Sequence, residues 1–368
     1  MRIGFDVSKA LMPHDGIGRY TLELLQALAL LAGDHELWLY DLYQDGARPV
    51  DEGSLREALG QWPANLRLRP GRPERDPLDV VHSITWVHPA VSGVPVLFTC
   101  HDLTFLTHPA CHTLANKIHC TTGILRAHLL GAEFLAVSRA TAGELRAQLG
   151  VAEERIHVVY SAAAPRFRRL AADDARRRVA ERFGVGEPYV LAVGTLEPRK
   201  NLRRLLDAYA RLPAALREAH PLLIAGAQGW GSGTVGELIA ERSELGTAHL
   251  LGRVSDDQLV ALYNAAAVFA FPSLAEGFGL PVVEAMACGA PVLTSDRSAT
   301  AEVGAGAALL VDPEDPAAIE RGLRQLLADP RERDRLRGLG AERAAAFSWE
   351  KTARETLELY RQLADRRA

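Results

Sequence analysis

The chain has 368 residues, of which 48% are hydrophobic and 24% are charged, as in ordinary globular proteins. At this length two domains of ordinary size are expected rather than a single core. The net charge of -4 at pH 7 leaves no basic excess to gather phosphates, so nucleic acid is not an expected partner.

The N-terminal sequence MRIGFDVSKALMP reads as a short apolar strand without the basic run of a signal peptide. No run of eighteen apolar residues occurs, so no membrane span is predicted, although peripheral association with a membrane stays open. The cysteines at 100, 111, 120 and 288 follow no disulfide or metal spacing, which favours a reduced, cytoplasmic setting. CHTLANKIHC could place two Cys-His pairs on one helix face, but ordinary helix-face residues are the preferred interpretation, and no metal site is predicted.

Short apolar runs alternate with amphipathic segments along the whole chain. The runs predict strands, in order RIGFDVS, HELWLYD, DVVHSI, PVLFTCHD, EFLAVS, IHVVYS, YVLAVG, PLLIAG, AHLLGRV, VFAFPS and PVLTSD. Helices are predicted between them, for example over residues 20–31, 113–130 and 139–149. Continuous apolar strands separated by helices indicate parallel sheets covered on both faces, which is the α/β class.

The alternation pauses once, in SAAAPRFRRLAADDARRR, and this predicts a domain boundary near Pro165. Residues 1–165 and 166–348 would then form two doubly wound, Rossmann-like domains, followed by a helix over residues 349–368. Such sheets bind ligands outside the carboxyl ends of their strands, so the ligand is expected in a cleft between the domains.

Two loops of the first half carry candidate residues. Gly16 and Gly18 precede a helix and could admit an anion to its N-terminus, although tight turns also use glycine for steric reasons. The loop lacks the full dinucleotide fingerprint, so no nicotinamide cofactor is expected. His101, with Asp102 after it, ends another strand and is either a ligand contact or a histidine satisfied by a backbone carbonyl.

The segment TLEPRKNL follows the strand YVLAVG. Arg199 and Lys200 stand just before Asn201, a residue type that suits the N-cap of the next helix. Two cations oppose the dipole at a helix start, and a bound diphosphate would remove that conflict. Solvated surface charges are the alternative interpretation.

The segment EGFGLPVVE follows the strand VFAFPS. Gly277 and Gly279 free the backbone between Glu276 and Glu284, and Pro281 suits the first turn of a helix. Backbone N–H groups of this loop could point into the cleft. The spacing alone allows the two carboxylates to be an acid-base pair or two groups that hold a ligand.

Three segments together resemble a known family. GTLEPRKNL, LGRVSDDQLVALYNAA and PSLAEGFGLPVVEAMACGAPVLTSD are similar to the retaining nucleotide-sugar glycosyltransferases of family four, which have the GT-B fold. The resemblance covers essentially the whole chain and is strongest over residues 189–313. HDLTFLTHP resembles the mannosyltransferase branch, which builds polysaccharides and lipid-linked glycans.

The resemblance implies a role for each candidate residue. Arg199 and Lys200 would bind the donor diphosphate, Glu284 the ribose hydroxyls and Glu276 the hydroxyls of the sugar. The backbone from Gly277 onward would meet sugar and phosphate, through Phe278, Gly279 and Leu280. Arg253 and Val254 would line the nucleobase, and His101 would lie beside the transferred sugar. The loop that contains Gly16 and Gly18 would close over the diphosphate.

The implied activity is transfer of a hexose to a glycan or lipid-linked hydroxyl with retention. The first expectation for the donor is GDP-mannose, with a UDP-sugar as the alternative. The last helix would cross back onto the N-terminal domain. No cofactor or metal is expected, because the chain contains no Asp-x-Asp triplet. Many relatives carry an arginine where this chain has Thr195, so Arg199 is the less secure phosphate ligand.

Rival functions remain open at this point. A glycoside hydrolase would use Glu276 and Glu284 as its two carboxylates but would leave Arg199 and Lys200 without a purpose. A nucleotide-sugar epimerase would need no second acceptor, and an inactive binding subunit would only hold the nucleotide. The sequence does not determine the acceptor, the linkage or the oligomeric state.

Overall fold

The computed structural model describes residues 1–12, 16–43, 50–229, 236–237, 239–240 and 245–366. The chain folds into two compact units. One unit contains Met1–Ser161 together with Ser348–Ala368, and the other contains Ala162–Phe347. We call them the N-terminal unit and the C-terminal unit and describe each by itself.

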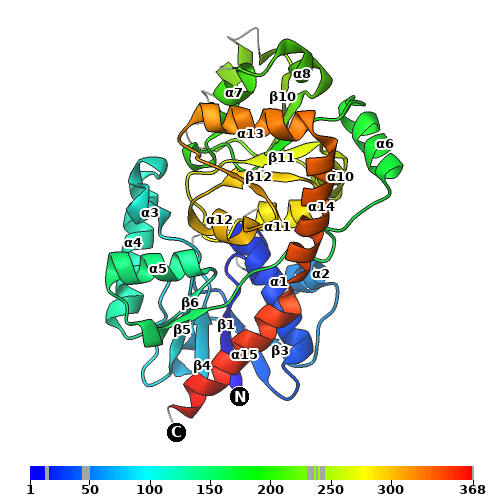
Figure 1. Cartoon of the computed structure of the whole chain (residues 1–368). Coiled ribbons are helices and arrows are strands. Elements are labelled where there is room, and N and C mark those ends of the chain that lie inside the picture. The colour runs from blue at the N-terminus through cyan, green and yellow to red at the C-terminus, as the bar shows by residue number, and fades with distance from the viewer. Residues whose placement is uncertain (13–15, 44–49, 230–235, 238, 241–244, 367–368) are drawn as a thin grey trace. The chain divides into compact units, whose positions relative to one another are not determined.

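A seven-stranded sheet forms the centre of the N-terminal unit, and every neighbouring pair of its strands is parallel. The strand order is β3-β2-β1-β4-β5-β6-β7. The strands are β1 Arg2–Asp6, β2 Glu36–Tyr40, β3 Leu66–Leu68, β4 Val80–Ser83, β5 Val96–Cys100, β6 Glu133–Ala136 and β7 Ile156–Val158 (Figure 1). The helices are α1 Gly16–Leu31, α2 Glu52–Leu59, α3 Thr104–Thr107, α4 Leu114–Leu129, α5 Arg139–Leu149 and α15 Trp349–Asp365, with short turns η1 Pro73–Arg75, η2 Pro109–Cys111 and η3 Glu153–Arg155.

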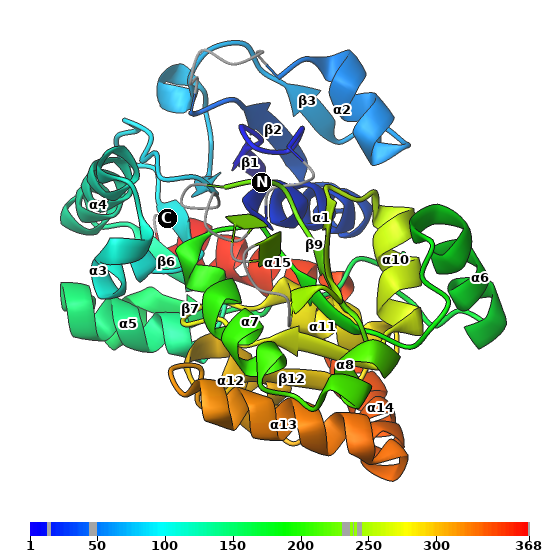
Figure 2. The same ribbon diagram turned by 90° about the horizontal axis from the view of Figure 1, so that it is seen from above.

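A six-stranded sheet, again wholly parallel, forms the centre of the C-terminal unit in the order β10-β9-β8-β11-β12-β13. The strands are β8 Val190–Val193, β9 Leu222–Ala225, β10 Ala248–Gly252, β11 Val268–Phe271, β12 Val292–Ser295 and β13 Leu309–Val311. The helices are α6 Ala172–Phe183, α7 Leu202–Ala210, α8 Ala214–Ala219, α10 Asp256–Ala265, α11 Leu280–Ala287, α12 Ser298–Gly304, α13 Pro316–Ala328 and α14 Pro330–Ala345, with the turn η4 Pro198–Lys200. Helix α13 packs beside α7 (Figure 2).

The two parallel sheets confirm the predicted α/β class with two doubly wound units. All eleven strands that the apolar runs predict are present, and two further strands, β3 and β13, are not among them. Each of these has three residues and lies at the edge of its sheet. The sequence of β3 is LRL, which shows no apolar run, whereas β13 has the short apolar sequence LLV that the prediction did not include.

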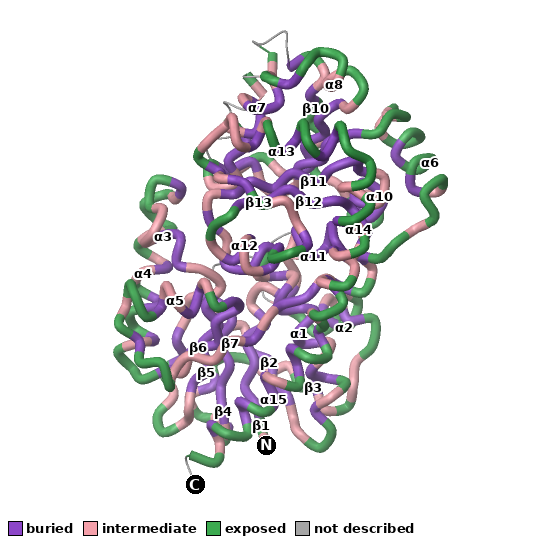
Figure 3. The backbone as a smooth tube through the Cα atoms, viewed as in Figure 1, coloured by how far each residue is buried: buried purple, intermediate pink, exposed green. Residues whose placement is uncertain are grey.

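Helix α15 belongs to the N-terminal unit and packs along α1 and against β4. Its Tyr360 is fully buried, and the Tyr360 hydroxyl lies 2.5 Å from Nδ1 of His82 on β4. The other ring nitrogen of His82 lies 2.7 Å from the Thr99 hydroxyl on β5. A polar chain therefore links the last helix to two central strands. Figure 3, in which buried residues are purple, shows that much of the central strands is buried.

The interpretation of CHTLANKIHC as one helix face is only partly correct. Cys111 ends the short turn η2, and α4 begins later, at Leu114, with the Thr113 hydroxyl accepting from the Asn116 N–H. Cys111 and His112 therefore do not share a helix with His119 and Cys120. Across the described ranges there is no group of three or more metal-ligating side chains. Within the same ranges no helix is both long and apolar enough to cross a membrane.

Candidate donor site

The carboxyl ends of β8 and β11 meet in the middle of the C-terminal sheet. These strands are hydrogen-bonded neighbours, while β9 follows β8 in sequence but lies on its other side. The strand order reverses between β8 and β11, and doubly wound sheets bind ligands at such a point. The loop after β8 carries Arg199 and Lys200, and the loop after β11 carries Glu276.

Glu276 forms ion pairs with both cations. Its Oε2 accepts from the Arg199 guanidinium at 2.6 Å, and its Oε1 accepts from the Lys200 ammonium at 2.7 Å. Arg199 also donates to Oε1 of Glu197 at 2.7 Å and to the Ala275 carbonyl at 3.0 Å. The Lys200 ammonium lies 5.0 Å from the centre of the Phe271 ring, within cation–π distance. The structure thus brings three of the predicted donor residues together.

The electrostatics of this cluster fix the charge of Glu276. Burial alone would raise the pKa of its carboxyl, but the neighbouring Arg199 and Lys200 outweigh that effect and lower this pKa to about 2. The side chains of Arg199, Lys200 and Glu276 are 14%, 12% and 9% exposed, so solvent screens the ion pairs only weakly. Glu276 is therefore a carboxylate at any ordinary pH.

Asn201 does not cap the following helix as predicted. It occupies the N-cap position of α7 with a left-handed backbone, but its side chain makes no capping hydrogen bond. Its amide instead donates to the carbonyls of Pro272 and Pro313 at 2.9 and 2.7 Å. The asparagine thereby ties the loop after β8 to the loops that follow β11 and β13. An isolated N-cap pattern cannot reveal such long-range partners.

The helix dipole does not require a diphosphate beside Arg199 and Lys200. Arg199 and Lys200 do precede α7, but the carboxylates of Glu197 and Glu276 already balance their charges. The cations therefore do not need a diphosphate to offset the dipole. The cluster offers an anion two preorganised donors rather than two unsatisfied charges.

The loop after β11 leads directly into α11. The helix begins at Leu280, with Pro281 in its first turn as predicted, and Gly279 at the N-cap has a left-handed backbone. The Phe278 ring is buried and packs edge-on to Phe347 with the ring centres 5.6 Å apart. The side chain of Phe278 thus faces the core of the C-terminal unit.

Glu284 lies one turn into α11 and is 2% exposed. The Tyr263 hydroxyl of α10 donates to Oε2 of Glu284 at 3.4 Å. Glu284 lies in the same unit as the Arg199–Lys200–Glu276 cluster, but its hydrogen bond is to Tyr263 rather than to either cation. Arg253 is exposed and Val254 half-buried, and both follow β10, whose last residue Gly252 accepts from the Gly226 N–H at the end of β9.

Three predicted residues belong to the N-terminal unit. Nε2 of His101 lies 3.1 Å from the Ile84 carbonyl, which is the backbone contact that the sequence left open as an alternative. The Tyr20 ring of α1 packs edge-on to the His101 ring at 4.9 Å. A Cβ added to Gly18 would lie 2.1 Å from the Met12 carbonyl oxygen, so close packing accounts for this glycine, whereas a Cβ on Gly16 would meet nothing within 4 Å.

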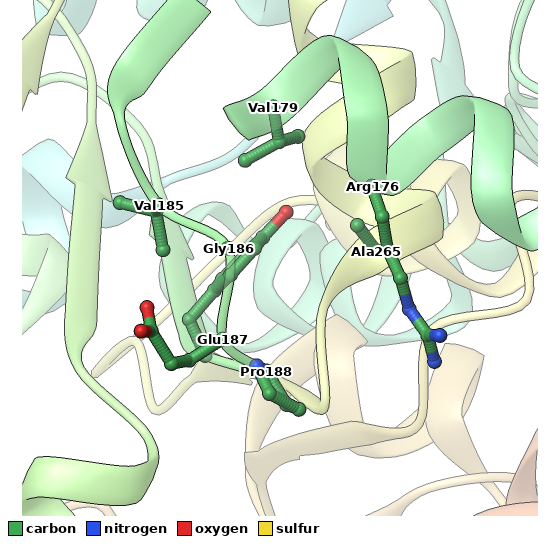
Figure 4. Close-up of a pocket in the computed structure, with 8 residues that line it drawn as sticks. Arg176, Val179, Val185, Gly186, Glu187, Pro188 and Ala265 are labelled. Carbon is green, nitrogen blue, oxygen red and sulfur yellow. The ribbon is translucent and has the colours of Figure 1, made fainter. Parts of the chain in front are cut away.

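One small pocket lies elsewhere in the C-terminal unit (Figure 4). Its lining includes Arg176 and Val179 of α6 and residues 185–189, which lead into β8. This is the amino edge of the sheet, whereas ligands of doubly wound sheets bind at the carboxyl edge. The pocket is therefore not part of the candidate donor site.

Comparisons with known proteins identify the family. Residues 14–166 match the model of "Glycosyltransferase Family 4", and residues 173–343 match that of "Glycosyl transferases group 1". The O-antigen chain mannosyltransferase B of Escherichia coli is 32% identical over 99% of this chain and 100% of its own length. The chain belongs to glycosyltransferase family four. The predicted family and enzyme class are thereby confirmed.

Two further proteins extend this finding. The MMP alpha-(1→4)-mannosyltransferase of Mycolicibacterium hassiacum is 34% identical over 62% of this family-four chain, which spans 53% of that relative. The Anabaena protein HepE, solved in complex with UDP and glucose, has a TM-score of 0.75 at 19% identity and covers 98% of this chain and 100% of its own. That likeness shows the fold and confirms the predicted GT-B architecture.

Sequence reasoning missed Glu197 and Tyr263 and assigned Asn201 the wrong role, that of a helix cap. Glu197 pairs with Arg199, Asn201 ties the loops together, and Tyr263 donates to Glu284. For Glu197 a signal existed, because it lies two residues before Arg199 in the same loop. For the other two, the partners come from distant parts of the chain.

Proposed function

We propose that this family-four glycosyltransferase transfers a hexose from a nucleotide sugar to a hydroxyl of a glycan or lipid-linked acceptor. The donor that we propose first is GDP-mannose, with a UDP-sugar as the alternative. The Arg199–Lys200–Glu276 cluster at the switch point of the C-terminal sheet is the observation that carries the proposal. The names of the Escherichia coli and Mycolicibacterium relatives, both mannosyltransferases, support mannose.

The cluster suits a diphosphate. Arg199 places a delocalised positive charge at the switch point of the sheet, and Lys200 adds a point charge beside it. Glu276 holds both cations in place before the donor arrives, so little reorganisation is needed on binding. The carboxylate has further lone pairs that can accept hydrogen bonds from hydroxyls of the sugar. In this proposal Glu284 accepts the ribose hydroxyls.

The reaction that we propose proceeds with retention and without a metal. The acceptor oxygen forms a bond to the anomeric carbon on the same face from which the diphosphate oxygen departs. The acceptor's proton passes to the departing phosphate, so no protein base is needed. Arg199, Lys200 and backbone N–H groups of the loop after β11 stabilise the negative charge that develops on the diphosphate.

The charge of Glu276 argues against the glycoside hydrolase alternative. A general acid must hold its proton near neutral pH, and the two cations instead lower the pKa of Glu276 to about 2. A nucleophile needs a free carboxylate oxygen, and here each oxygen accepts from a cation. Glu276 therefore fits the role of a positioning and binding group.

A thermal-shift panel tests the proposal. GDP-, UDP- and ADP-sugars are each added to the full chain, and the cognate donor should raise the unfolding temperature as its occupancy rises. Release of free nucleoside diphosphate by the wild-type protein should then be faster when an acceptor is present. Absence of any shift with every nucleotide sugar would contradict a transferase function.

Site variants sharpen the test. Lys200→Ala and Glu284→Ala should each lower turnover by roughly tenfold or more while the protein stays folded, since each loses a charged contact to the donor. Arg203→Ala is the matched control, because Arg203 lies three residues after Lys200 but is exposed on α7. Near-normal turnover in either site variant would remove it from the donor site.

A further inference from the structure

Two residues beside the Arg199–Lys200–Glu276 cluster have an unusual backbone. Among the residues that the structure describes, Asn201 and Ser298 are the only non-glycine residues with a positive φ, of 59° and 55°. Asparagine tolerates this left-handed region, but serine rarely adopts it, and glycine would do so at no steric cost. Such strain persists where the surrounding structure and a functional role sustain it. The backbone of Ser298 thus indicates a role for its hydroxyl.

The Ser298 hydroxyl contacts the loop after β11. Its Oγ accepts from the Glu276 N–H at 3.2 Å, although the two residues are 22 positions apart in the chain. Ser298 is the first residue of α12, but Arg297 occupies the N-cap of that helix and makes no side-chain capping bond. A capping role at the start of α12 therefore does not account for this serine.

This hydrogen bond helps to fix one peptide group at both of its polar atoms. The Glu276 N–H and the Ala275 carbonyl belong to the same planar, trans peptide unit and point in opposite directions. The carbonyl accepts from the Arg199 guanidinium at 3.0 Å, while the N–H donates to Ser298. Rotation of this peptide would break both bonds. The backbone of Glu276 is therefore held in the orientation from which its carboxylate contacts Arg199 and Lys200.

The first turn of α12 also contacts the far end of the same segment. A Cβ added to Gly279, whose φ is 94°, would lie 3.1 Å from Cγ2 of Thr300. Thr300 is fully buried, and its hydroxyl donates to the Arg297 carbonyl at 3.0 Å. Helix α12 thus supports residues 276–279 at both ends, and Ser298 supplies the hydrogen bond at Glu276.

We propose that Ser298 is a positioning residue of the donor site. It acts through the Ala275–Glu276 peptide, which it fixes, and so through the carboxylate that holds the Lys200 ammonium. This role rests on the proposed function, in which the bound molecule is a nucleotide sugar. A site whose groups are already fixed binds more tightly, because less motion is lost when the ligand arrives.

Calorimetric titration of the full chain with GDP-mannose and with UDP-glucose tests the proposal. Ser298→Gly removes the hydroxyl and adopts the same backbone without strain, so its unfolding temperature should stay close to that of wild type. Its affinity for the nucleotide sugar that wild type binds should fall roughly fivefold to tenfold, with unchanged stoichiometry. Ser298→Ala should show the same loss of affinity and a lower unfolding temperature, because alanine keeps the strain.

The stoichiometry separates positioning from a purely structural role. A residue that only stabilised the fold would lower the fraction of molecules that bind and would leave the affinity of the folded molecules unchanged. That result in Ser298→Gly, or wild-type affinity in this variant, would overturn the proposal.

Gly306→Ser is the matched control. Gly306 follows α12, is exposed and has a φ of 74°, and a Cβ there would meet nothing within 4 Å. A serine at this position should lower the unfolding temperature through backbone strain and leave the affinity for the nucleotide sugar unchanged. A loss of affinity equal to that of Ser298→Gly would contradict the specific role of Ser298.

A double-mutant cycle tests the same contact without a ligand. If Ser298 positions the Glu276 carboxylate, the two residues are energetically coupled. Glu276→Gln should therefore lower the unfolding temperature less in the Ser298→Gly background than in the wild-type background. Equal losses in both backgrounds would overturn the positioning role. Coupling in a protein that binds no nucleotide sugar would contradict the proposed function and would still support the positioning of Glu276 by Ser298.

Discussion

Glu276 shows how a single buried residue sets the chemistry of its surroundings. Its carboxylate contacts Arg199 and Lys200 through different oxygens. The sequence places all three residues in loops that follow strands. It predicted that Arg199 and Lys200 bind the diphosphate and that Glu276 binds the sugar, without predicting contact among them. Their pairing depends on β8 and β11 being neighbours in the sheet, and strand order is a property of the fold rather than of either loop.

Glu276→Gln should lower the free energy of unfolding by about 3 kcal/mol at pH 7, because the amide leaves the buried Lys200 ammonium without its counter-charge and Arg199 with that of Glu197 alone. The pKa of Glu276 is lowered from 4.5 to about 2 in the folded chain. Its stabilisation is therefore complete above about pH 4.5 and is lost as the pH falls toward 2.

Urea unfolding of wild type and Glu276→Gln between pH 7 and pH 3 measures this loss of stability. The difference between their free energies of unfolding should stay constant down to about pH 4.5 and become smaller below that pH. Glu218→Gln on α8, an exposed site of the same unit, serves as the control. A difference no larger than that of the control would contradict the role of Glu276 as counter-charge.

At the scale of elements, close packing decides what some residues can be. The sequence placed Gly16 and Gly18 before a helix and left two reasons open for them, ligand approach and steric need; the structure places both in the first turn of α1. The structure separates the two reasons, because only Gly18 lies against backbone, that of Lys9 and Met12, while Gly16 has free space around it. No pattern within the loop distinguishes the two glycines, since the contact depends on how the chain folds back over the helix start.

Gly18→Ala should therefore destabilise the chain by about 1–3 kcal/mol, the usual cost of overpacking. The new methyl group would lie 2.1 Å from the Met12 carbonyl oxygen, and backbone cannot move aside as a side chain can. Gly16→Ala should change stability by less than about 0.5 kcal/mol. Thermal unfolding of the two variants gives the comparison, and a larger effect at Gly16 would contradict the packing account.

At the scale of the whole molecule, the repeated alternation of apolar strands and helices predicted the fold well. It located eleven strands and the final helix, because most buried parallel strands carry a clear apolar run. It missed β3 and β13, two strands of three residues at sheet edges. In the donor site it found Arg199, Lys200, Glu276 and Glu284. It did not find Glu197 or Tyr263, and it assigned Asn201 to a helix cap because the carbonyls that Asn201 contacts lie far away along the chain.

The last helix connects distant parts of the N-terminal unit, and its Tyr360 provides a test. Burial lowers the pKa of His82 to about 3, so the ring is neutral and one nitrogen accepts while the other donates. Tyr360→Phe would leave Nδ1 of His82 buried without its partner and should lower the free energy of unfolding by about 1–3 kcal/mol.

Tyr43→Phe is the control for this variant, since the Tyr43 ring is only half-buried and packs against His119 and Lys9. Chemical denaturation at pH 7 should show that Tyr43→Phe and wild type have nearly the same free energy of unfolding. Equal stability of Tyr360→Phe and wild type would mean that the buried hydrogen bond does not hold α15 in place.

The proposed function depends most on binding of the diphosphate of a nucleotide sugar by the loops after β8 and β11. Calorimetric titration of GDP and UDP into wild type, Lys200→Ala and Arg203→Ala tests it directly. Wild type and Arg203→Ala should bind one nucleotide with equal affinity, and Lys200→Ala should bind it roughly tenfold or more weakly. Unchanged affinity in Lys200→Ala, or no binding of either nucleotide by wild type, would contradict the proposed function.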